Sequence, residues 1–382
     1  MKIVIYTNIL TPYRKHFYDL IYNQCKKNGD EFYVYVMAPT EPGRNWFYDD
    51  FKMEYTVLLE NKTITKSTIS IHFNKNLKEK LTMLKPDLVI CAGSYLCPGV
   101  WKVLSLQKKL GYKCMFWSES HLSEQRNYSR VKLWVRDNIR KTFYSKFDGF
   151  LYAGKKSKDF IEKYSIEDKK MVFCPNIINN IAFNDAVKFK ESKLEEIKNK
   201  YSIDKNKINF ICPARLISVK GIEEFLESII KYPQKDRIRI YLAGDGDRKD
   251  AIEKISSENG IDVRFLGYKN QNEIIELYAA CDFFLMPSLS DANPLTCVEA
   301  LWAGKPLLVS NHVGNYPEAV NIGENGYVFS CEDRTSIVEI LNEIIDKDCE
   351  WYINAKIESL RIADSIYNPE KNVERILNEW KK

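Results

Sequence analysis

The sequence has no apolar run long enough to cross a bilayer. A membrane-spanning helix needs about 20 consecutive apolar residues, and the apolar stretches here are much shorter. The first ten residues, MKIVIYTNIL, are also too short an apolar segment for a secretory signal, and Asn8 interrupts them. We therefore expect a cytoplasmic protein, and the 45% hydrophobic and 29% charged content is typical of a globular chain.

Signatures of metal centres and disulfide frameworks are missing as well. The ten cysteines include no CxxC pair and lie mostly in or beside apolar runs, which is typical of buried, reduced thiols. The four histidines, at positions 16, 72, 121 and 312, are scattered without a zinc-ligand spacing. We therefore expect no metal ion and no other cofactor.

The net charge of +5 conceals an uneven distribution. Residues 1–176 carry 30 Lys and Arg against 18 Asp and Glu, whereas the rest of the chain carries 27 against 34. A basic half beside an acidic half indicates that one face meets an anionic partner. No nucleic-acid-binding motif accompanies this charge, so nucleic acid is not the expected partner.

Residues 126–146 are the most basic part of the chain. They contain seven Lys or Arg and one acid, and their aromatic residues include Trp134, Phe143 and Tyr144. The pattern predicts a basic amphipathic helix of the kind that lies on an anionic membrane surface. A solvated helix that packs an apolar stripe on the protein remains the alternative.

Short apolar runs alternate with helical patterns in both halves of the chain. This alternation predicts βαβ units, mainly parallel sheets and helices on both sheet faces. We predict an α/β protein of two doubly wound, Rossmann-like domains facing a central cleft, formed by residues 1–176 and 186–365. Residues 177–185 are expected to be neither strand nor helix and to link them. The expected strands are 3–6, 32–37, 88–91, 114–117, 149–152, 171–174, 208–212, 239–243, 263–266, 283–286 and 307–309.

The segment 281–310, CDFFLMPSLSDANPLTCVEALWAGKPLLVS, predicts a strand, a loop, a helix and a strand. Asn293 is expected to cap the helix and Pro294 to occupy its first position. The N–H groups at such a helix start favour an anion such as a phosphate. Asp291 in the loop and Glu299 in the otherwise apolar helix flank this position. Taken alone, they could also be a loop acid and a surface acid.

This segment resembles the signature of the retaining glycosyltransferases of family 4, P-S-x-x-E-G-x-P-x-x-x-x-E-A-x-A-x-G-x-P. Asp291 stands at its first acid, Ala292 at a usual glycine and Asn293 at a common phenylalanine. The matching residues are Pro287, Ser288, Pro294, Glu299, Ala300, Ala303, Gly304 and Pro306. The resemblance covers most of 208–330 well and the N-terminal half loosely. It implies the GT-B fold, with a final helix within 366–382 that packs back on the first domain.

The resemblance also implies where a nucleotide-sugar donor binds. Residues 212–221, CPARLISVKG, resemble an element whose Arg and Lys meet the donor phosphates, here Arg215 and Lys220. Arg offers a fork of donors to phosphate oxygens and Lys a point charge. Family 4 members, where studied, use such fixed cations in place of a metal. Asp291 would then lie by the sugar hydroxyls and Glu299 by the ribose.

Further donor-binding residues follow from the same resemblance. Gly244 and Gly246 resemble a turn in which glycines let the backbone approach the nucleotide. Leu266, Gly267 and Tyr268 resemble a turn beside the base, with Tyr268 as a stacking partner. The other expected donor contacts are Ala292, Asn293, Pro294, Leu295 and Thr296.

On the N-terminal side the candidates follow two predicted strands. Arg14, after the first strand, is a candidate for an anionic acceptor, and Glu119 ends another strand that points the same way. The resemblance implies that His121 contacts the donor sugar or the leaving phosphate, although a polar loop histidine without that role stays open. Pro317 and Glu318 resemble a later P-E segment, and Glu318 is expected to cap a helix.

The function implied is that of a metal-independent retaining glycosyltransferase. It would move a hexose from a nucleoside-diphosphate sugar to a hydroxyl of a glycan or polyprenyl-linked glycan in surface polysaccharide biosynthesis. A peripheral position at the inner face of the cell membrane would explain the basic half. A GT-B nucleotide-sugar 2-epimerase and a non-catalytic sugar-nucleotide binding module remain alternatives. The expected catalytic residues are Arg215, Lys220, Asp291, Glu299 and His121.

Overall fold

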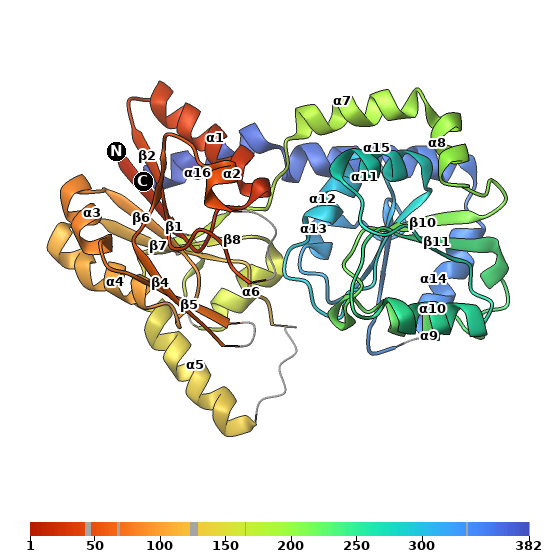
Figure 1. Cartoon of the computed structure of the whole chain (residues 1–382), viewed down its shortest axis with the longest axis horizontal. Helices are drawn as coiled ribbons and strands as arrows, with labels where there is room; N and C mark the ends of the chain where they lie inside the picture. Colours follow the sequence, from red (N-terminus) through yellow and green to blue (C-terminus); the bar gives the residue numbers. More distant parts are fainter. Residues whose placement is uncertain (43–46, 67–68, 123–128, 165, 334, 382) are drawn as a thin grey trace.

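Two α/β domains lie side by side in the computed structural model (Figure 1). The structure describes residues 1–42, 47–66, 69–122, 129–164, 166–333 and 335–381. The N-terminal domain runs from red to yellow and the C-terminal domain from green to blue (Figure 1). Each is built on a parallel sheet, as the alternation of apolar runs and helical patterns predicted.

The N-terminal domain has a seven-stranded sheet in the order β3-β2-β1-β6-β7-β8-β9, and all its pairs are parallel. A separate antiparallel hairpin, β4-β5, was not predicted from the sequence. The strands are β1 (Lys2–Thr7), β2 (Glu31–Val36), β3 (Thr56–Leu58), β4 (Asn61–Lys66), β5 (Ile69–Asn74), β6 (Leu88–Ala92), β7 (Lys113–Ser118), β8 (Gly149–Tyr152) and β9 (Met171–Phe173). The helices are α1 (Pro12–Lys27), α2 (Tyr48–Phe51), α3 (Leu77–Leu84), α4 (Pro98–Leu110), α5 (Arg130–Tyr144) and α6 (Lys155–Glu162), with a 3-10 turn η1 (Asp168–Lys170).

The C-terminal domain has a six-stranded parallel sheet in the order β12-β11-β10-β13-β14-β15. Its strands are β10 (Ile208–Cys212), β11 (Ile238–Leu242), β12 (Val263–Phe265), β13 (Phe283–Met286), β14 (Leu307–Ser310) and β15 (Gly326–Phe329). Its helices are α8 (Leu194–Lys200), α9 (Ile222–Ser228), α10 (Lys249–Glu258), α11 (Gln271–Ala280), α12 (Leu295–Trp302), α13 (Tyr316–Ala319), α14 (Thr335–Ile345) and α15 (Cys349–Ile366), with 3-10 turns η2 (Ser218–Lys220) and η3 (Lys235–Arg237).

Both sheets are apolar on both faces, which is why their strands appear in the sequence as continuous apolar runs. In β1, Val4 and Tyr6 join one buried cluster and Ile3 and Ile5 join the cluster on the opposite face. The same alternation divides the buried residues of β10 between two clusters. Helices therefore cover each sheet from both sides.

Two helices connect the domains. The prediction that residues 177–185 are neither strand nor helix is wrong, because α7 (Asn180–Glu191) begins inside that segment. Asn179 caps it, and α7 packs on α11 through an apolar stripe that includes Phe183 and Val187. The final helix, α16 (Pro369–Trp380), returns to the N-terminal domain and packs on α1 (Figure 1). Its buried residues there are Val373, Ile376, Leu377 and Trp380.

Strand order reverses once in each sheet, beside the first strand of the domain. β1 lies between β2 and β6, and β10 lies between β11 and β13. Loops that leave the carboxyl ends of such neighbouring strands diverge to opposite faces of the sheet, which opens a crevice between them. Two cavities bordered by both domains contain residues from these loops.

Candidate active site

The loops after β10 and β13 bring Lys220 and Asp291 together. Because β10 and β13 are neighbours where the strand order reverses, their carboxyl ends open onto one crevice. The Nζ atom of Lys220 lies 2.5 Å from Oδ2 of Asp291, and both side chains are mostly shielded from solvent. Two of the predicted site residues, which are 71 positions apart, therefore form an ion pair.

Gly221 allows the β10 loop to approach the end of β13. Its φ of +65° is in the left-handed region, and a Cβ atom there would lie 2.1 Å from the carbonyl oxygen of Pro287. The N–H of Leu289 also donates to the carbonyl oxygen of Val219 at 2.9 Å. Arg215 lies earlier on the same loop with an exposed side chain. The loop thus carries one paired and one exposed cation.

Helix α12 begins one residue later than predicted. Pro294 has an extended backbone and precedes the helix, so Leu295 and Thr296 form its first turn. The prediction that Asn293 caps the helix is wrong, because its Nδ2 atom donates to the carbonyl oxygen of Ala153 in the other domain, at 3.2 Å. The N-terminal end of α12 carries a positive partial charge that favours an anion in the crevice.

Glu299 is the one acid of α12, and Tyr278 of α11 is its partner. The Tyr278 hydroxyl lies 3.2 Å from Oε2 of Glu299. Burial raises the pKa of Glu299 to about 7, although the Tyr278 hydrogen bond lowers it. Glu299 lines a cavity of about 390 Å³ together with Gln271, Leu295 and residues of α1. Its carboxyl group is therefore accessible to hydroxyl groups of a ligand in that cavity.

The glycine turn after β11 serves the packing of two loops. A Cβ atom at Gly244 would lie 1.9 Å from the carbonyl oxygen of Ala214, and one at Gly246 would lie 2.2 Å from that of Leu216. The N–H of Leu216 donates to the carbonyl oxygen of Asp245 at 2.9 Å. Both glycines therefore make room for the β10 loop that carries the cations. Their contact with a nucleotide stays a prediction.

The turn after β12 presents an aromatic ring to solvent. Tyr268 is 81% exposed and follows Leu266 and Gly267, whose φ is +70°. Gln271, three positions further on at the start of α11, lines the same cavity as Glu299, but none of the three turn residues is among its lining residues. An exposed ring can stack on a planar ligand, and the contact of Tyr268 with a base stays a prediction.

His121 lies on the N-terminal side of the crevice and is almost fully buried, with 1% of its surface exposed. Within the described part of the chain, neither ring nitrogen has a hydrogen-bond partner. Burial, and next the positive charge of Lys156, lower the pKa of His121 to about 4, and the Asp291 carboxylate opposes this only in part. At neutral pH the ring is therefore uncharged, with one nitrogen able to donate and the other to accept.

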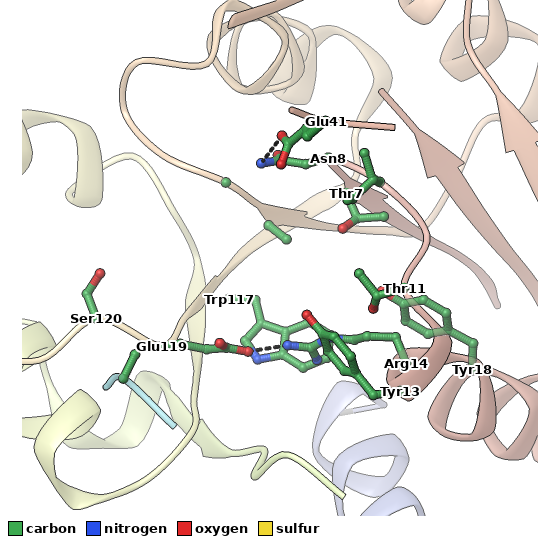
Figure 2. A pocket seen from close by; sticks show the side chains of 14 residues that line it. Thr7, Asn8, Thr11, Tyr13, Arg14, Tyr18, Glu41, Trp117, Glu119 and Ser120 are labelled. Atoms are coloured by element: carbon green, nitrogen blue, oxygen red, sulfur yellow. Dashed lines mark hydrogen bonds and ion pairs between the residues drawn. The ribbon is translucent and has the colours of Figure 1, made fainter. Parts of the chain in front are cut away.

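A second cavity, of about 310 Å³, opens at the carboxyl ends of β1, β6 and β7 (Figure 2). It contains both residues that the sequence suggested for an acceptor, Arg14 and Glu119. Their side chains form an ion pair, and the Arg14 guanidinium lies 3.9 Å from the centre of the Trp117 ring (Figure 2). Ala292 of the C-terminal domain closes one side. This cavity therefore adjoins the loop that carries Asp291.

The domains touch through the start of α6. Glu318 caps a helix as expected, but the helix belongs to the other domain: its carboxylate accepts from the N–H of Lys155. Lys156 donates to the carbonyl oxygen of Asn311, and its Nζ atom lies 4.7 Å from the centre of the Tyr316 ring. Sequence reasoning missed these contacts, because no local pattern connects positions so far apart.

Most of the basic stretch 126–146 lies in helix α5, Arg130–Tyr144, and residues 126–128 lie outside the described part of the chain. Val131, Trp134, Val135 and Ile139 form an apolar stripe on the solvent side, and Trp134 is 68% exposed. The helix projects from the domain (Figure 1). Its N-terminal part, which carries this stripe, is thus not packed on the core. Among the described helices, none is both long and apolar enough to span a bilayer.

Across the described ranges, no group of three or more His, Cys, Asp or Glu side chains has an arrangement that could hold a metal ion. The ten cysteines are all free thiols, and eight of them are buried.

Comparisons with known proteins identify the fold and the C-terminal domain. Residues 193–357 match the family model described as glycosyl transferases group 1. The chain is 31% identical over 173 residues to an uncharacterized 41.2 kDa protein in the cps region of Klebsiella pneumoniae, covering 45% of this chain and 46% of that protein. It is 24% identical over 199 residues to an N,N'-diacetylbacillosaminyl-diphospho-undecaprenol alpha-1,3-N-acetylgalactosaminyltransferase of Campylobacter jejuni, covering 52% and 51%.

The chain spans about half the length of these curated relatives. Over its whole length it is similar to HepE of Anabaena, solved in complex with UDP, with a TM-score of 0.75, 16% identity and full coverage of both chains. The molecule is therefore a GT-B protein, as predicted. The match to the model of the glycosyl transferases group 1 covers residues 193–357, less than half of the chain. Family 4 in particular remains a resemblance.

Proposed function

We propose that the protein is a retaining glycosyltransferase that moves a hexose from a nucleoside-diphosphate sugar to a hydroxyl of a glycan or lipid-linked glycan. The observation that carries this proposal is the convergence of Lys220, Asp291 and the start of α12 on one crevice. The relative from Campylobacter jejuni is named for a transfer to a diphospho-undecaprenol acceptor. A surface polysaccharide is the product class we propose.

In this proposal the C-terminal domain holds the donor. Lys220, Arg215 and the N-terminal end of α12 neutralise the diphosphate without a metal ion, because fixed charges in a preorganised site stabilise a leaving anion. Glu299 accepts hydrogen bonds from the ribose hydroxyls. Tyr268 stacks on the base. Asp291 exchanges part of its contact with Lys220 for a hydroxyl of the donor sugar.

The transfer itself breaks the bond between the sugar's anomeric carbon and the phosphate oxygen, and forms a bond from that carbon to the acceptor oxygen on the same face. The leaving phosphate takes the acceptor's proton, so no side chain has to act as a base. Neutral His121 donates a hydrogen bond to the sugar or the phosphate, since its pKa of about 4 leaves it uncharged at pH 7. Retention of configuration follows from attack on the face that the phosphate leaves.

Two measurements test the donor site. A thermal-shift panel of nucleoside diphosphates, starting with UDP, finds the base, because a ligand at about 100 times its dissociation constant adds roughly 2.7 kcal/mol of stability. In the Lys220→Ala variant, the nucleoside diphosphate should produce only a small thermal shift. Turnover of the matching nucleotide sugar should fall about 100-fold. Lys231→Ala is the matched control, because that exposed lysine follows α9 and so lies at the opposite edge of the sheet. Unchanged turnover in Lys220→Ala would refute the phosphate site.

Donor-only incubations separate the alternatives. Conversion of the donor sugar without an acceptor would indicate a 2-epimerase, and binding without any turnover would indicate a binding module. Turnover that survives strong chelation supports the metal-free mechanism, and its loss would contradict it.

We also propose that α5 holds the protein at the inner face of the cell membrane. The support is its exposed apolar stripe beside basic residues, Arg130 and Lys132 among them. Apolar side chains can enter the headgroup region while the cations meet anionic lipids.

A further inference from the structure

The cavity of Figure 2 contains a second acid that no motif indicated. Glu41 comes from the segment after β2 and lines the cavity across from the pair of Arg14 and Glu119 (Figure 2). Asn8, which follows β1, donates its Nδ2 hydrogen to Oε1 of Glu41 at 3.4 Å. The acid is thus held over the carboxyl edge of the sheet.

The buried side chain of His72 holds the Glu41 carboxylate in place through a hydrogen bond. His72 of β5 is 2% exposed, and its Nε2 atom lies 3.0 Å from Oε1 of Glu41. Because an ionised carboxylate only accepts, Nε2 carries the hydrogen, and in the neutral ring Nδ1 accepts from the Thr63 hydroxyl at 2.8 Å. Both neighbours of Glu41 therefore bind the same oxygen, Oε1.

The hairpin that supplies His72 is itself tied to the domain core. Two positions further along β5, the Asn74 amide donates to the carbonyl oxygen of Met37 at 2.9 Å and accepts from the Tyr6 hydroxyl at 2.7 Å. All three residues lie inside the domain, so the hairpin holds His72 rigidly. A carboxylate has about four acceptor positions, and with two used on Oε1, Oε2 can serve a ligand.

The charges around the cavity favour one class of ligand. Of the described residues that line it, Arg14 is the sole cation, and Glu41 and Glu119 are the acids. Arg14 is paired with Glu119 and stacked on Trp117. A carboxylate or phosphate on a ligand would meet an uncompensated acid, whereas a hydroxyl can donate to it.

We propose that this cavity binds the acceptor as a sugar that presents uncharged hydroxyl groups, one of which donates to Glu41. His72 is a positioning residue that orients Glu41. The inference rests on the glycosyl transfer proposed above and narrows its acceptor from any hydroxyl to a neutral sugar. It also replaces the expectation that Arg14 meets an anionic acceptor, because two acids outnumber that cation among the described lining residues.

Paired octyl glycosides test the proposal. Dissociation constants for the glucoside and glucuronide, and for the galactoside and galacturonide, are measured by ligand-observed NMR with the stabilising nucleoside diphosphate present. The neutral member of at least one pair should bind about tenfold more tightly than its acid. Glu41→Gln should raise the dissociation constant of that neutral glycoside about tenfold and should reduce the difference in affinity between it and its acid. Glu79, an exposed acid on α3, provides the control, because Glu79→Gln should change neither quantity.

Two variants of His72 test its role in orienting Glu41. His72→Ala should weaken the neutral glycoside as Glu41→Gln does, and His72→Gln, whose amide can still donate, should restore most of the binding. The nucleotide thermal shift should be equal in all these variants, which separates this proposal from the donor site. Tighter binding of the acids, unchanged binding in Glu41→Gln, or no glycoside binding beside a normal nucleotide shift would each overturn it.

Discussion

Lys220 has a carboxylate partner in this structure, so a phosphate entering the crevice competes with Asp291 for the same ammonium group. The two side chains are 2.5 Å apart and mostly shielded from solvent. Asp291 is also one methylene shorter than the glutamate of the family signature. It therefore balances two roles in the proposal, as partner of the cation and as contact of the sugar.

Replacing this acid should separate the two roles. In Asp291→Asn, a nucleoside diphosphate should bind about three- to tenfold more tightly, because Lys220 no longer has an anionic competitor. Transfer should fall, because the sugar contact weakens. Calorimetry with the nucleotide and a transfer assay check both effects, and Asp250→Asn, an exposed acid of α10, is the control. Weaker nucleotide binding in Asp291→Asn would contradict this account.

Glu299 makes stability depend on pH. Its pKa is about 7 when folded against an ordinary 4.5, so between those values the folded chain binds more protons than the unfolded chain. The free energy of unfolding should therefore fall as pH rises from about 4.5 to 7. In Glu299→Gln, the dependence of the free energy of unfolding on pH should become shallower, by the equivalent of up to about one bound proton. The part of the dependence that comes from Glu318 should remain. Urea unfolding at several pH values measures it, and Glu258→Gln, on the surface of α10, should keep the wild-type slope.

At the scale of elements, α5 is both amphipathic and exposed. Val131, Trp134, Val135 and Ile139 recur at helical spacing on the side away from the core. The far end of the helix is buried through Phe143. Only the outer part thus offers an apolar surface, and the basic residues between those positions supply the charge.

This surface should bind anionic vesicles. Co-sedimentation with vesicles rich in phosphatidylglycerol should be strong at about 0.05 M salt and weak at about 0.5 M, since salt screens the charges. Trp134→Ala should reduce binding at both salt concentrations, because the buried ring area is lost. Phe189→Ala, an exposed aromatic residue of α7, is the matched control. Vesicle binding that changes neither with salt concentration nor in Trp134→Ala would refute the proposal.

Elements also show where local patterns suffice. Every predicted strand is present, because a strand covered on both faces is a continuous apolar run. The exposed hairpin β4-β5 was missed, since all of β4 is solvated and carries no such run. Two short strands of the main sheets, β3 and β15, were missed as well. Helix α7 was missed because its apolar stripe is short, and its helical state depends on packing against α11.

At the scale of the whole molecule, the contact between Glu318 and α6 is one of those that join the two domains. Burial raises the pKa of Glu318 to about 7, while the Lys155 N–H and side chain lower it and Asp159 raises it. When the domains separate, this carboxyl group is rehydrated and its pKa returns toward the ordinary 4.5. The closed form thus binds more protons between those values.

Domain closure should therefore weaken as pH rises from about 4.5 to 7. Small-angle scattering should report a larger radius of gyration at the upper end for the wild type and a constant one for Glu318→Gln. Glu324→Gln, an exposed acid nearby in sequence, should behave as the wild type. A wild-type radius that does not change with pH would contradict this.

Gly154→Ala tests the contact between Glu318 and α6 through steric crowding, without a change of charge. The φ of Gly154 is 174°, which any residue adopts, so alanine acts only through its Cβ atom, 2.8 Å from Oε2 of Glu318. The Glu318 carboxylate has to shift to make room, so this variant should weaken the contact at every pH, and the same scattering measurement checks it.

The sequence by itself determined most strands of the two parallel sheets, the order of the cations, glycines and acids along the second domain, and the basic character of the first. Each of these depends on neighbours within a few turns, where apolar periodicity and Gly or Pro chemistry act directly.

Only the tertiary structure decided the pairs that make a site: Lys220 with Asp291, Glu299 with Tyr278, and Glu41 with His72. It also decided that Asn293 and Glu318 serve the opposite domain. The physical reason is that a hydrogen bond or ion pair requires atoms about 3 Å apart. For residues tens of positions apart, only the packing of whole elements sets that distance.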